Sequence, residues 1–258
     1  MNSPATSLAL RHAAFGDPNE VLGLEEVKLP PLAPGEVALG FLVAPINPAD
    51  FGRINGTYGQ LAQLPATAGL EGVAEVIALG PDTSLFQIGD RVLAPSDTGS
   101  WQTHANALES SLFRAPSSPS VQQAAMFWIN PATAWRLMHD FANLKPGDYI
   151  VQNAATSAVG KLVIQFAHHL GIRTVNLVRN LAAAPELFKH GATHVFEDNR
   201  DAPKAILKAI GPDKCKLGLN AVGGSSALSI AKTLADAAPL VTYGGMDRDP
   251  APFPTRYL

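Results

Sequence analysis

Residues 148–160 read Asp-Tyr-Ile-Val-Gln-Asn-Ala-Ala-Thr-Ser-Ala-Val-Gly, and this stretch decides the fold class. Its first part, 148–153, is rich in β-forming residues and follows a Lys-Pro-Gly turn, which predicts a strand. From Val159 to Leu170, apolar residues recur at offsets 0, 3, 4, 7, 8 and 11, which is the spacing of one helix face. The stretch therefore predicts a strand, a tight turn and a helix.

The turn between this strand and helix consists of small residues, and residues 174–178 predict the next strand. A helix N-terminus that follows a strand can bind a pyrophosphate, because its N–H groups point outward and its dipole favours negative charge. A strict G-x-G-x-x-G fingerprint would need glycines at positions occupied by Ala155 and Ser157, and only Gly160 remains. Thr156 and Ser157 add hydroxyl donors for a phosphate. The alternative is an ordinary strand–helix–strand crossover whose small residues serve packing alone.

The second strand ends on Arg179-Asn180. An NAD site usually carries an acidic residue at this place, which binds the ribose 2′-hydroxyl. A carboxylate would repel a 2′-phosphate, whereas a guanidinium binds it through charge-assisted hydrogen bonds. The sequence therefore favours NADPH as the cofactor, the alternative being a solvated arginine on a loop.

The composition excludes several classes of protein. With 258 residues, 47% of them apolar and 16% charged, the chain has ample material for a core. A net charge of −3 argues against nucleic acid or an anionic membrane as the main partner. The single cysteine, Cys215, excludes intrachain disulfides and a cysteine-rich zinc site. No membrane-spanning run and no targeting pattern at the N-terminus are visible, so we expect a cytoplasmic protein.

Two domains are expected. Residues 1–125 are rich in Gly and Pro and contain short strand candidates, which predicts a rolled, mostly antiparallel β domain. Residues 126–258 alternate between strands and helices, which predicts a doubly wound parallel sheet. The expected elements of both domains are strands at 37–43, 72–79, 90–94, 194–196, 217–221 and 240–243, a short helix near 47–51, and helices at 121–128, 131–144, 184–190, 203–210 and 226–234.

The chain ends at Leu258, soon after the fifth predicted strand of the second domain. A six-stranded dinucleotide-binding sheet would be one strand short, so we expect a truncated or unusual C-terminus.

The order of two such domains resembles the medium-chain dehydrogenase/reductase superfamily, and within it the zinc-free 2-enoyl-thioester reductases, the branch of mitochondrial trans-2-enoyl-CoA reductase and its bacterial relatives. The resemblance covers about residues 8–245. It is carried by nine blocks in order: Ile46-Asn-Pro-Ala-Asp50, Ile54-Asn-Gly-Thr-Tyr-Gly59, Gly69-Leu-Glu-Gly72, Asn130-Pro-Ala-Thr-Ala134, Leu144-Lys-Pro-Gly-Asp148, 152–160, 173–179, Asn220-Ala-Val-Gly-Gly224 and Val241-Thr-Tyr-Gly-Gly-Met246.

The resemblance implies fold and chemistry. The first domain is expected to be GroES-like and the second a Rossmann domain. Where zinc-dependent relatives carry a ligand histidine, this chain has Leu70, so no catalytic metal is expected. The implied reaction is hydride transfer from NADPH to the β-carbon of an enoyl thioester. The family's proposed acid maps onto Tyr58, whose phenol is a donor at neutral pH. An ordinary loop tyrosine between two glycines is the alternative.

The family also implies cofactor contacts. Asn130 is expected near the nicotinamide and Arg179-Asn180 near the 2′-phosphate. The family often has a second basic residue two positions after this arginine, but this chain has Leu181 there. The residues expected at the pyrophosphate and at the far wall of the cofactor cleft are Thr156, Ser157, Ala158, Val159, Tyr243, Gly244, Gly245 and Met246. The full-length protein is expected to be a homodimer with a small-molecule enoyl thioester or enone substrate.

Two other functions stay open at this point: a zinc-free NADPH:quinone or enone reductase, and a non-catalytic NADPH-binding protein. Other conspicuous side chains have ordinary explanations. His168-His169 and His104 fit solvated surfaces, and Glu71 fits a structural role that holds neighbouring loops.

Overall fold

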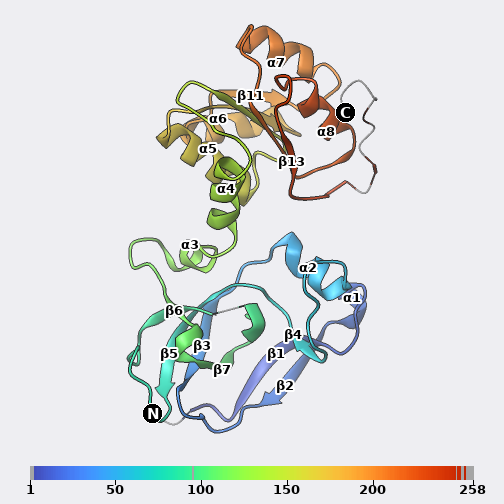
Figure 1. Ribbon diagram of the computed structural model, residues 1–258. Coiled ribbons are helices and arrows are strands. Elements are labelled where there is room, and N and C mark those ends of the chain that lie inside the picture. The colour runs from blue at the N-terminus through green and yellow to red at the C-terminus, as the bar shows by residue number, and fades with distance from the viewer. Residues whose placement is uncertain (1–2, 95, 248, 251–252, 254–258) are drawn as a thin grey trace. The chain divides into compact units, whose positions relative to one another are not determined.

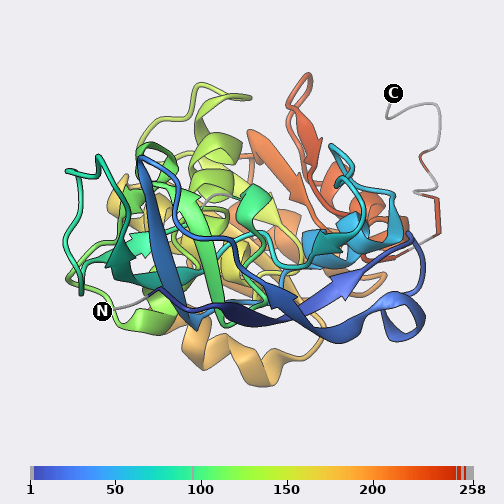
Figure 2. The same cartoon turned by 90° about the horizontal axis from the view of Figure 1, so that it is seen from below.

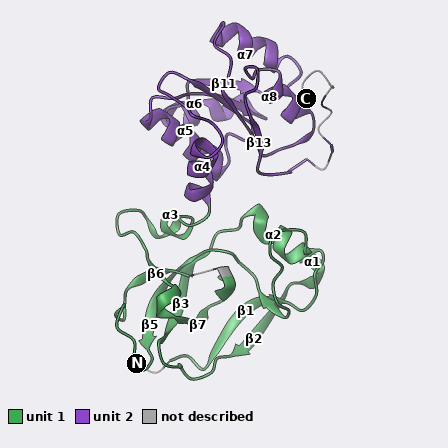
Figure 3. Ribbon diagram, in the orientation of Figure 1, with its two compact units in different colours: residues 1–129 green, residues 130–258 purple. Residues whose placement is uncertain are grey.

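The computed structural model describes residues 3–94, 96–247, 249–250 and 253 (Figure 1). The chain divides into two compact units, residues 1–129 and 130–258 (Figure 3). No helix among the described residues is long and apolar enough to cross a membrane.

Unit 1 contains two antiparallel sheets, which can be followed in Figures 1 and 2. One has the strand order β2-β1-β4 and the other β7-β3-β5-β6-β8. The strands are β1 Thr6–His12, β2 Gly23–Lys28, β3 Glu36–Val43, β4 Ala66–Thr67, β5 Val73–Leu79, β6 Arg91–Leu93, β7 His104–Leu108 and β8 Phe113–Arg114. The expected rolled antiparallel β domain is confirmed.

The helices of unit 1 are short. They are α1 Pro18–Val21, α2 Pro48–Asn55, α3 Val121–Ala125 and the 3₁₀ helices η1 Ser96–Thr98 and η2 Glu109–Ser111. The core of the larger sheet includes Val37, Leu39 and Val76, all fully buried. Strand β1 was not predicted, because its buried positions include Ser7 and Ala9 whereas Leu8 between them is 46% exposed. Polar and small residues on the inner face conceal the usual alternation.

Unit 2 is a doubly wound domain around five parallel strands in the order β11-β10-β9-β12-β13. This is the order 3-2-1-4-5 along the chain, as in a dinucleotide-binding sheet. The strands are β9 Tyr149–Gln152, β10 Arg173–Val178, β11 His194–Glu197, β12 Leu217–Asn220 and β13 Leu240–Thr242. The predicted parallel sheet is confirmed, and each predicted strand lies within two residues of the observed one.

Helices cover both faces of this sheet (Figure 1). Helices α4 and α5 pack on one face around Ile150 and Leu219, and α7 packs on the other around Val151 and Val175. The helices of unit 2 are α4 Asn130–His139, α5 Ala158–His169, α6 Ala184–Lys189, α7 Ala202–Ile210, α8 Gly224–Ala231 and the 3₁₀ helix η3 Leu181–Ala183.

The helix predicted over 131–144 is too long, because α4 ends at His139. Ala142 and Leu144 lie in the following loop and pack against the same apolar cluster as α4. Their spacing therefore continues the helical pattern although the backbone has left the helix. Burial, not helix periodicity, explains why these residues are apolar.

Gly160 fixes how α5 approaches the turn after β9. A Cβ atom at this position would lie 2.8 Å from the Ala154 carbonyl oxygen and 2.8 Å from the Ala155 Cα. No real side chain fits at such a distance from the backbone. The one glycine that the sequence keeps from the fingerprint is therefore the one required for close helix–strand packing.

We predict that Gly160→Ala destabilises unit 2. The clash with backbone atoms is expected to cost about 1–3 kcal/mol, more than the ~1 kcal/mol that alanine gains over glycine within a helix. Calorimetry of thermal unfolding measures the change. Gly245→Ala is the control, since a Cβ there has no atom within 4 Å. Equal unfolding midpoints for the two variants would contradict the packing argument.

Candidate functional site

The carboxyl ends of the five parallel strands form the candidate site of unit 2. Strand β9 lies between β10 and β12, so chain connections leave it in opposite directions on its two sides. Ligands of doubly wound sheets bind outside the carboxyl ends at such a switch point. The segments at this edge begin at Asn153, Arg179, Asp198, Ala221 and Tyr243.

The turn after β9 has the features of an anion site. Ala154 adopts a left-handed conformation with φ +47°, and the Ser157 N–H donates to its carbonyl oxygen at 2.9 Å. The Ser157 hydroxyl caps α5 by accepting from the Gly160 N–H at 3.0 Å. Among the residues that the structure describes, no partner accepts from the N–H groups of Ala158 and Val159. These two groups at a helix N-terminus fit a pyrophosphate.

Asn153 joins three segments of this edge. Its side-chain amide donates to Asn220 Oδ1 and to Ser226 Oγ, both at 2.8 Å, and its Oδ1 accepts from the Ala221 N–H at 2.7 Å. Asn153 is completely buried. Asn220 in turn accepts from the Gly223 N–H at 2.9 Å, which shapes the turn before α8. These bonds fix the end of β9 against the end of β12.

Asp198 extends this network to β11. Its Oδ2 accepts from the Ser226 hydroxyl at 2.5 Å, while the same hydroxyl accepts from Asn153. Burial raises the pKa of the Asp198 carboxyl, and the hydrogen bond from Ser226 opposes this rise. The carboxyl ends of β9, β11 and β12 are thereby connected through side chains.

The segment after β13 lies beside the turn after β12. The Tyr243 N–H donates to the Asn220 carbonyl oxygen at 3.0 Å and the Met246 N–H to that of Ala221 at 3.2 Å. A Cβ on Gly244 would lie 2.8 Å from the Ala221 carbonyl oxygen, so only glycine permits this approach. Gly245 and Met246 are exposed.

The hydroxyl of Tyr243 is buried, and it has no hydrogen-bond partner among the described residues. Burial raises the pKa of Tyr243 to about 12, and the nearby Ser157 side chain offsets this only in part. Tyr243 is therefore neutral at physiological pH. Its ring packs against the cluster formed by α4, α5 and the sheet.

Arg179 is the first residue after β10, and its side chain is exposed. No ion pair with Arg179 occurs among the described residues, so its guanidinium is available to a phosphate. The Asn180 Oδ1 accepts from the Ala182 N–H at 2.9 Å and caps η3. Asn180 thus has a local structural role, and its contact with the 2′-phosphate stays a prediction.

The remaining predicted residues lie on other elements. Asn130 is buried at the start of α4 in unit 2. Tyr58 belongs to unit 1, in the loop after α2, and is 53% exposed. A Cβ on Gly52 would lie 2.8 Å from the Tyr58 Cβ, so Tyr58 sits directly against α2. Gly56 and Gly59, with φ +75° and +51°, provide the bends on its two sides.

Two buried carboxyl groups, Asp50 and Glu71, flank the position of Leu70 in unit 1. Burial raises the pKa of both groups, against hydrogen bonds from backbone N–H groups. Within the described residues, no group of three or more His, Cys, Asp and Glu side chains could hold a metal ion. The absence of zinc stays a prediction.

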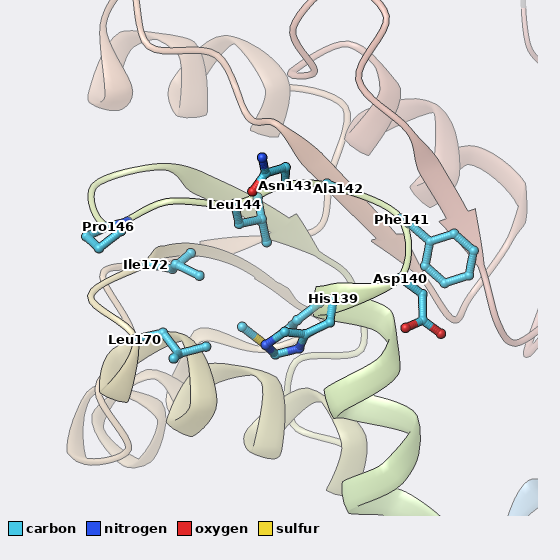
Figure 4. Close-up of a pocket in the computed structure, with 10 residues that line it drawn as sticks. His139, Asp140, Phe141, Ala142, Asn143, Leu144, Pro146, Leu170 and Ile172 are labelled. Atoms are coloured by element: carbon cyan, nitrogen blue, oxygen red, sulfur yellow. The ribbon is translucent and has the colours of Figure 1, made fainter.

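A pocket of about 650 Å³ opens elsewhere on unit 2 (Figure 4). It is lined by the end of α4, the loop that follows, and residues such as Leu170 and Ile172. Ile172 precedes β10 and Pro146 precedes β9, so this pocket lies at the amino ends of the strands. Its position excludes it as the cofactor site of a doubly wound sheet, despite its size.

No site role for Asn153, Asp198 or Ser226 was expected from the sequence. A signal existed for Asn153, because Gln152-Asn153 places two polar residues at the end of an apolar strand. Buried polar groups need partners, so such residues indicate a side-chain network. Nothing local to Asp198 or Ser226 shows that they lie close to Asn153.

Two family descriptions match the chain. Residues 33–116 match "Alcohol dehydrogenase GroES-like domain" and residues 158–258 match "Zinc-binding dehydrogenase". Human mitochondrial enoyl-[acyl-carrier-protein] reductase is 40% identical over 255 residues, which cover 96% of this chain and 68% of the human protein.

Solved structures of reductases are also similar to this chain. The Etr1p/Etr2p heterodimer of the mitochondrial 2-enoyl thioester reductase from Candida tropicalis superposes with a TM-score of 0.87 at 30% identity, covering 97% of this chain and 78% of that one. The Etr1p/NADP/crotonyl-CoA complex has a TM-score of 0.88 at 30% identity, with 97% and 78% covered. A putative NADPH:quinone reductase from Bacillus thuringiensis has a TM-score of 0.87 at 29% identity, with 96% and 76% covered.

The expected cytoplasmic location is wrong. The human relative, that of Xenopus tropicalis at 41% identity and that of Arabidopsis thaliana at 39% all carry "mitochondrial" in their names, which points to mitochondria instead. Targeting segments are removed from mature proteins and contribute nothing to the fold. The residues of the folded domains therefore could not reveal the compartment.

We predict opposite pH dependences for two aspartate substitutions in unit 2. Because folding raises the pKa of Asp198, its contribution to stability is present below the unfolded pKa and is lost as pH rises through the folded pKa. Wild type should therefore lose stability relative to Asp198→Asn as pH rises from about 4 to about 7. Urea unfolding at both pH values measures the difference.

Asp148→Asn is the matched control. The hydrogen bond from Lys216, which lies 2.8 Å from Asp148 Oδ1, lowers the pKa of this carboxyl. Its contribution is present above the unfolded pKa and is lost as pH falls through the folded pKa. Asp148→Asn should therefore lose stability relative to wild type as pH rises toward about 4, and change little between about pH 4 and pH 7. A similar gain in stability by both variants between about pH 4 and pH 7 would refute the burial argument for Asp198.

Proposed function

Because the chain belongs to the 2-enoyl-thioester reductase branch of the medium-chain dehydrogenase/reductase superfamily, we propose that it reduces 2-enoyl thioesters with NADPH. The observation that carries this proposal is 40% identity to an enoyl-[acyl-carrier-protein] reductase across 96% of the chain. The solved Etr1p complex with NADP and crotonyl-CoA supports the same cofactor and class of substrate.

The residues of unit 2 fit NADPH. The free N–H groups of Ala158 and Val159 and the hydroxyl of Thr156 suit the pyrophosphate, and Gly244 leaves the wall after β13 without a side chain. Arg179 offers a guanidinium to the 2′-phosphate, with no acidic residue in the adjoining position. Asn130 is assigned to the nicotinamide side. The cofactor, when bound, supplies the hydride that reaches the β-carbon of the substrate.

We assign to Tyr58 the role of proton donor. Its hydroxyl donates to the α-carbon or stabilises the enolate charge on the thioester oxygen. The fixed bends at Gly56 and Gly59 and the contact with Gly52 hold the ring while leaving it half exposed to a substrate. We accordingly assign substrate binding to unit 1 and cofactor binding to unit 2.

A quinone or enone reductase is the second candidate, because the putative quinone reductase from Bacillus thuringiensis superposes as well as Etr1p does. Stopped-flow NADPH oxidation with crotonyl-CoA and with a quinone, offered separately, distinguishes the two. Oxidation with crotonyl-CoA alone supports the enoyl-thioester assignment. Oxidation with the quinone alone would replace it.

The Candida tropicalis heterodimer supports a dimeric assembly for this protein as well. Whether two identical chains form the dimer is decided by sedimentation equilibrium of the purified protein. A homodimer is the proposed state.

We predict that Arg179→Ala weakens the binding of NADPH far more than the binding of NADH. Loss of one charge-assisted contact of roughly 1.5–3 kcal/mol corresponds to about ten- to a hundredfold in affinity. Fluorescence titration with each cofactor measures the two dissociation constants. Lys208→Ala, an exposed cation on α7, should alter neither. An equal loss for both cofactors would show that Arg179 does not read the 2′-phosphate.

We predict that Tyr58→Phe slows turnover and leaves cofactor binding intact. Positioned acid catalysis contributes about 10²–10⁴-fold, so kcat should fall within this range. NADPH affinity should stay within about threefold, since the cofactor residues lie in unit 2. Thr57→Ala in the same loop is the control. Wild-type turnover of crotonyl-CoA by Tyr58→Phe would make this tyrosine a spectator.

A further inference from the structure

Glu71 is 2% exposed, and its two carboxylate oxygens serve two different segments of unit 1. Oε1 accepts from Asn47 Nδ2 at 2.9 Å, and Oε2 accepts from the Ile129 N–H at 2.9 Å. The segments that it connects lie 24 and 58 residues away along the chain. A single buried carboxylate thus joins the loop after Leu70 to both.

The Asn47 contact holds the start of α2. The Asn47 N–H donates to Asp50 Oδ2 at 2.6 Å, and Asp50 Oδ1 accepts from the Leu70 N–H at 2.9 Å. Asn47, Asp50 and Glu71 therefore lock the first turn of α2 onto the loop that carries Glu71. The same helix supports Tyr58 through Gly52, one turn further along. The place of Tyr58 depends on where this helix is fixed.

The Ile129 contact holds the point where the chain leaves unit 1. Ile129 is its last residue, and Asn130 begins both unit 2 and helix α4. The last residue of unit 1 is therefore held by the group that fixes α2. Asn130, which we assign to the nicotinamide side, follows directly.

We propose that Glu71 is a positioning residue for the reaction, which holds helix α2, against which Tyr58 packs, and the exit segment before Asn130 in one fixed relation. The proposal rests on the proposed function, since it assumes that Tyr58 and Asn130 serve the same reaction. Glu71 contacts neither substrate nor cofactor in this role. A misplacement of about 1 Å at a reacting group can cost a hundredfold in rate, so such a tie has kinetic consequences.

Glu71→Gln tests the proposal at nearly unchanged volume. The amide keeps one oxygen and replaces the other by a donor, so one of the two N–H donors loses its acceptor. Glu109→Gln is the matched control: Glu109 is 7% exposed, also lies in unit 1, and accepts from the Ser84 and Leu85 N–H groups at 2.9–3.0 Å. Both variants should lower the unfolding midpoint.

Only Glu71→Gln should change the kinetics. We expect kcat with crotonyl-CoA to fall by roughly tenfold or more, with NADPH affinity within about twofold of wild type. In a Tyr58→Phe background, Glu71→Gln should lower kcat by less than it does in wild type, because the group that it positions is already gone. Equal kcat for Glu71→Gln and Glu109→Gln, or fully multiplicative effects with Tyr58→Phe, would overturn the proposal.

Amide hydrogen exchange gives a readout that does not need turnover. In Glu71→Gln, exchange should accelerate in both 47–58 and 128–130, and in neither segment in Glu109→Gln. Faster exchange in one segment alone would refute the proposal that Glu71 holds both segments. If wild type fails to reduce crotonyl-CoA, the proposed function fails, and the exchange result still decides whether Glu71 connects the two segments.

Asn47→Ala is the second variant, should Glu71→Gln fail to fold. It removes the bond to α2 and leaves the Glu71–Ile129 bond in place. We expect slower turnover together with unchanged exchange at Ile129. Wild-type turnover by Asn47→Ala would contradict a positioning role for this cluster.

Discussion

The hydrogen bonds of Asn153 are the constraint on which the candidate site of unit 2 depends. One buried amide joins the end of β9 to Asn220, to the Ala221 N–H and to Ser226. A buried amide left without partners would cost about 1–3 kcal/mol for each group. The arrangement of these strand ends is therefore specified by polar side chains, whereas the sheet itself is held by apolar packing on its two faces.

The turn that follows Asn153 shows how a site can survive without most of the glycine fingerprint. Ala154 takes the left-handed conformation at some cost, since alanine rarely adopts positive φ. Gly160 remains because any Cβ there would meet the backbone of the turn. Ala155 is completely buried and so contributes packing. Free N–H groups at the start of α5 depend on backbone geometry, which small residues other than glycine can also supply.

In unit 1, two buried carboxylates hold the chain around Leu70, the position at which zinc-dependent relatives are expected to carry a ligand histidine. Asp50 and Glu71 hold backbone N–H groups from Leu70, Asn47 and Ile129, and burial raises the pKa of both. These bonds join the start of α2, the loop at Leu70 and the segment that ends at Ile129. The prediction that Glu71 holds neighbouring loops is confirmed by its two hydrogen bonds.

Local patterns in the sequence were sufficient for the strands of unit 2. The helical spacing from Val159 to Leu170 and the alternation of short apolar runs predicted the strands and their parallel arrangement, because periodicity reflects burial on one face or two. The same logic failed for β1, where small and polar residues are buried, and at the end of α4, where loop residues are apolar. The compartment could not be read from the folded domains at all.

The sequence by itself determined the two-domain organisation, the parallel sheet, and Arg179 at the end of the second strand, because these depend on neighbours along the chain. Only the tertiary structure decided that Asp198 and Ser226 reach Asn153, and that Glu71 reaches Ile129 across 58 residues. Hydrogen bonds act over about 3 Å, and which distant residues come within that distance is fixed by the packing of the whole unit.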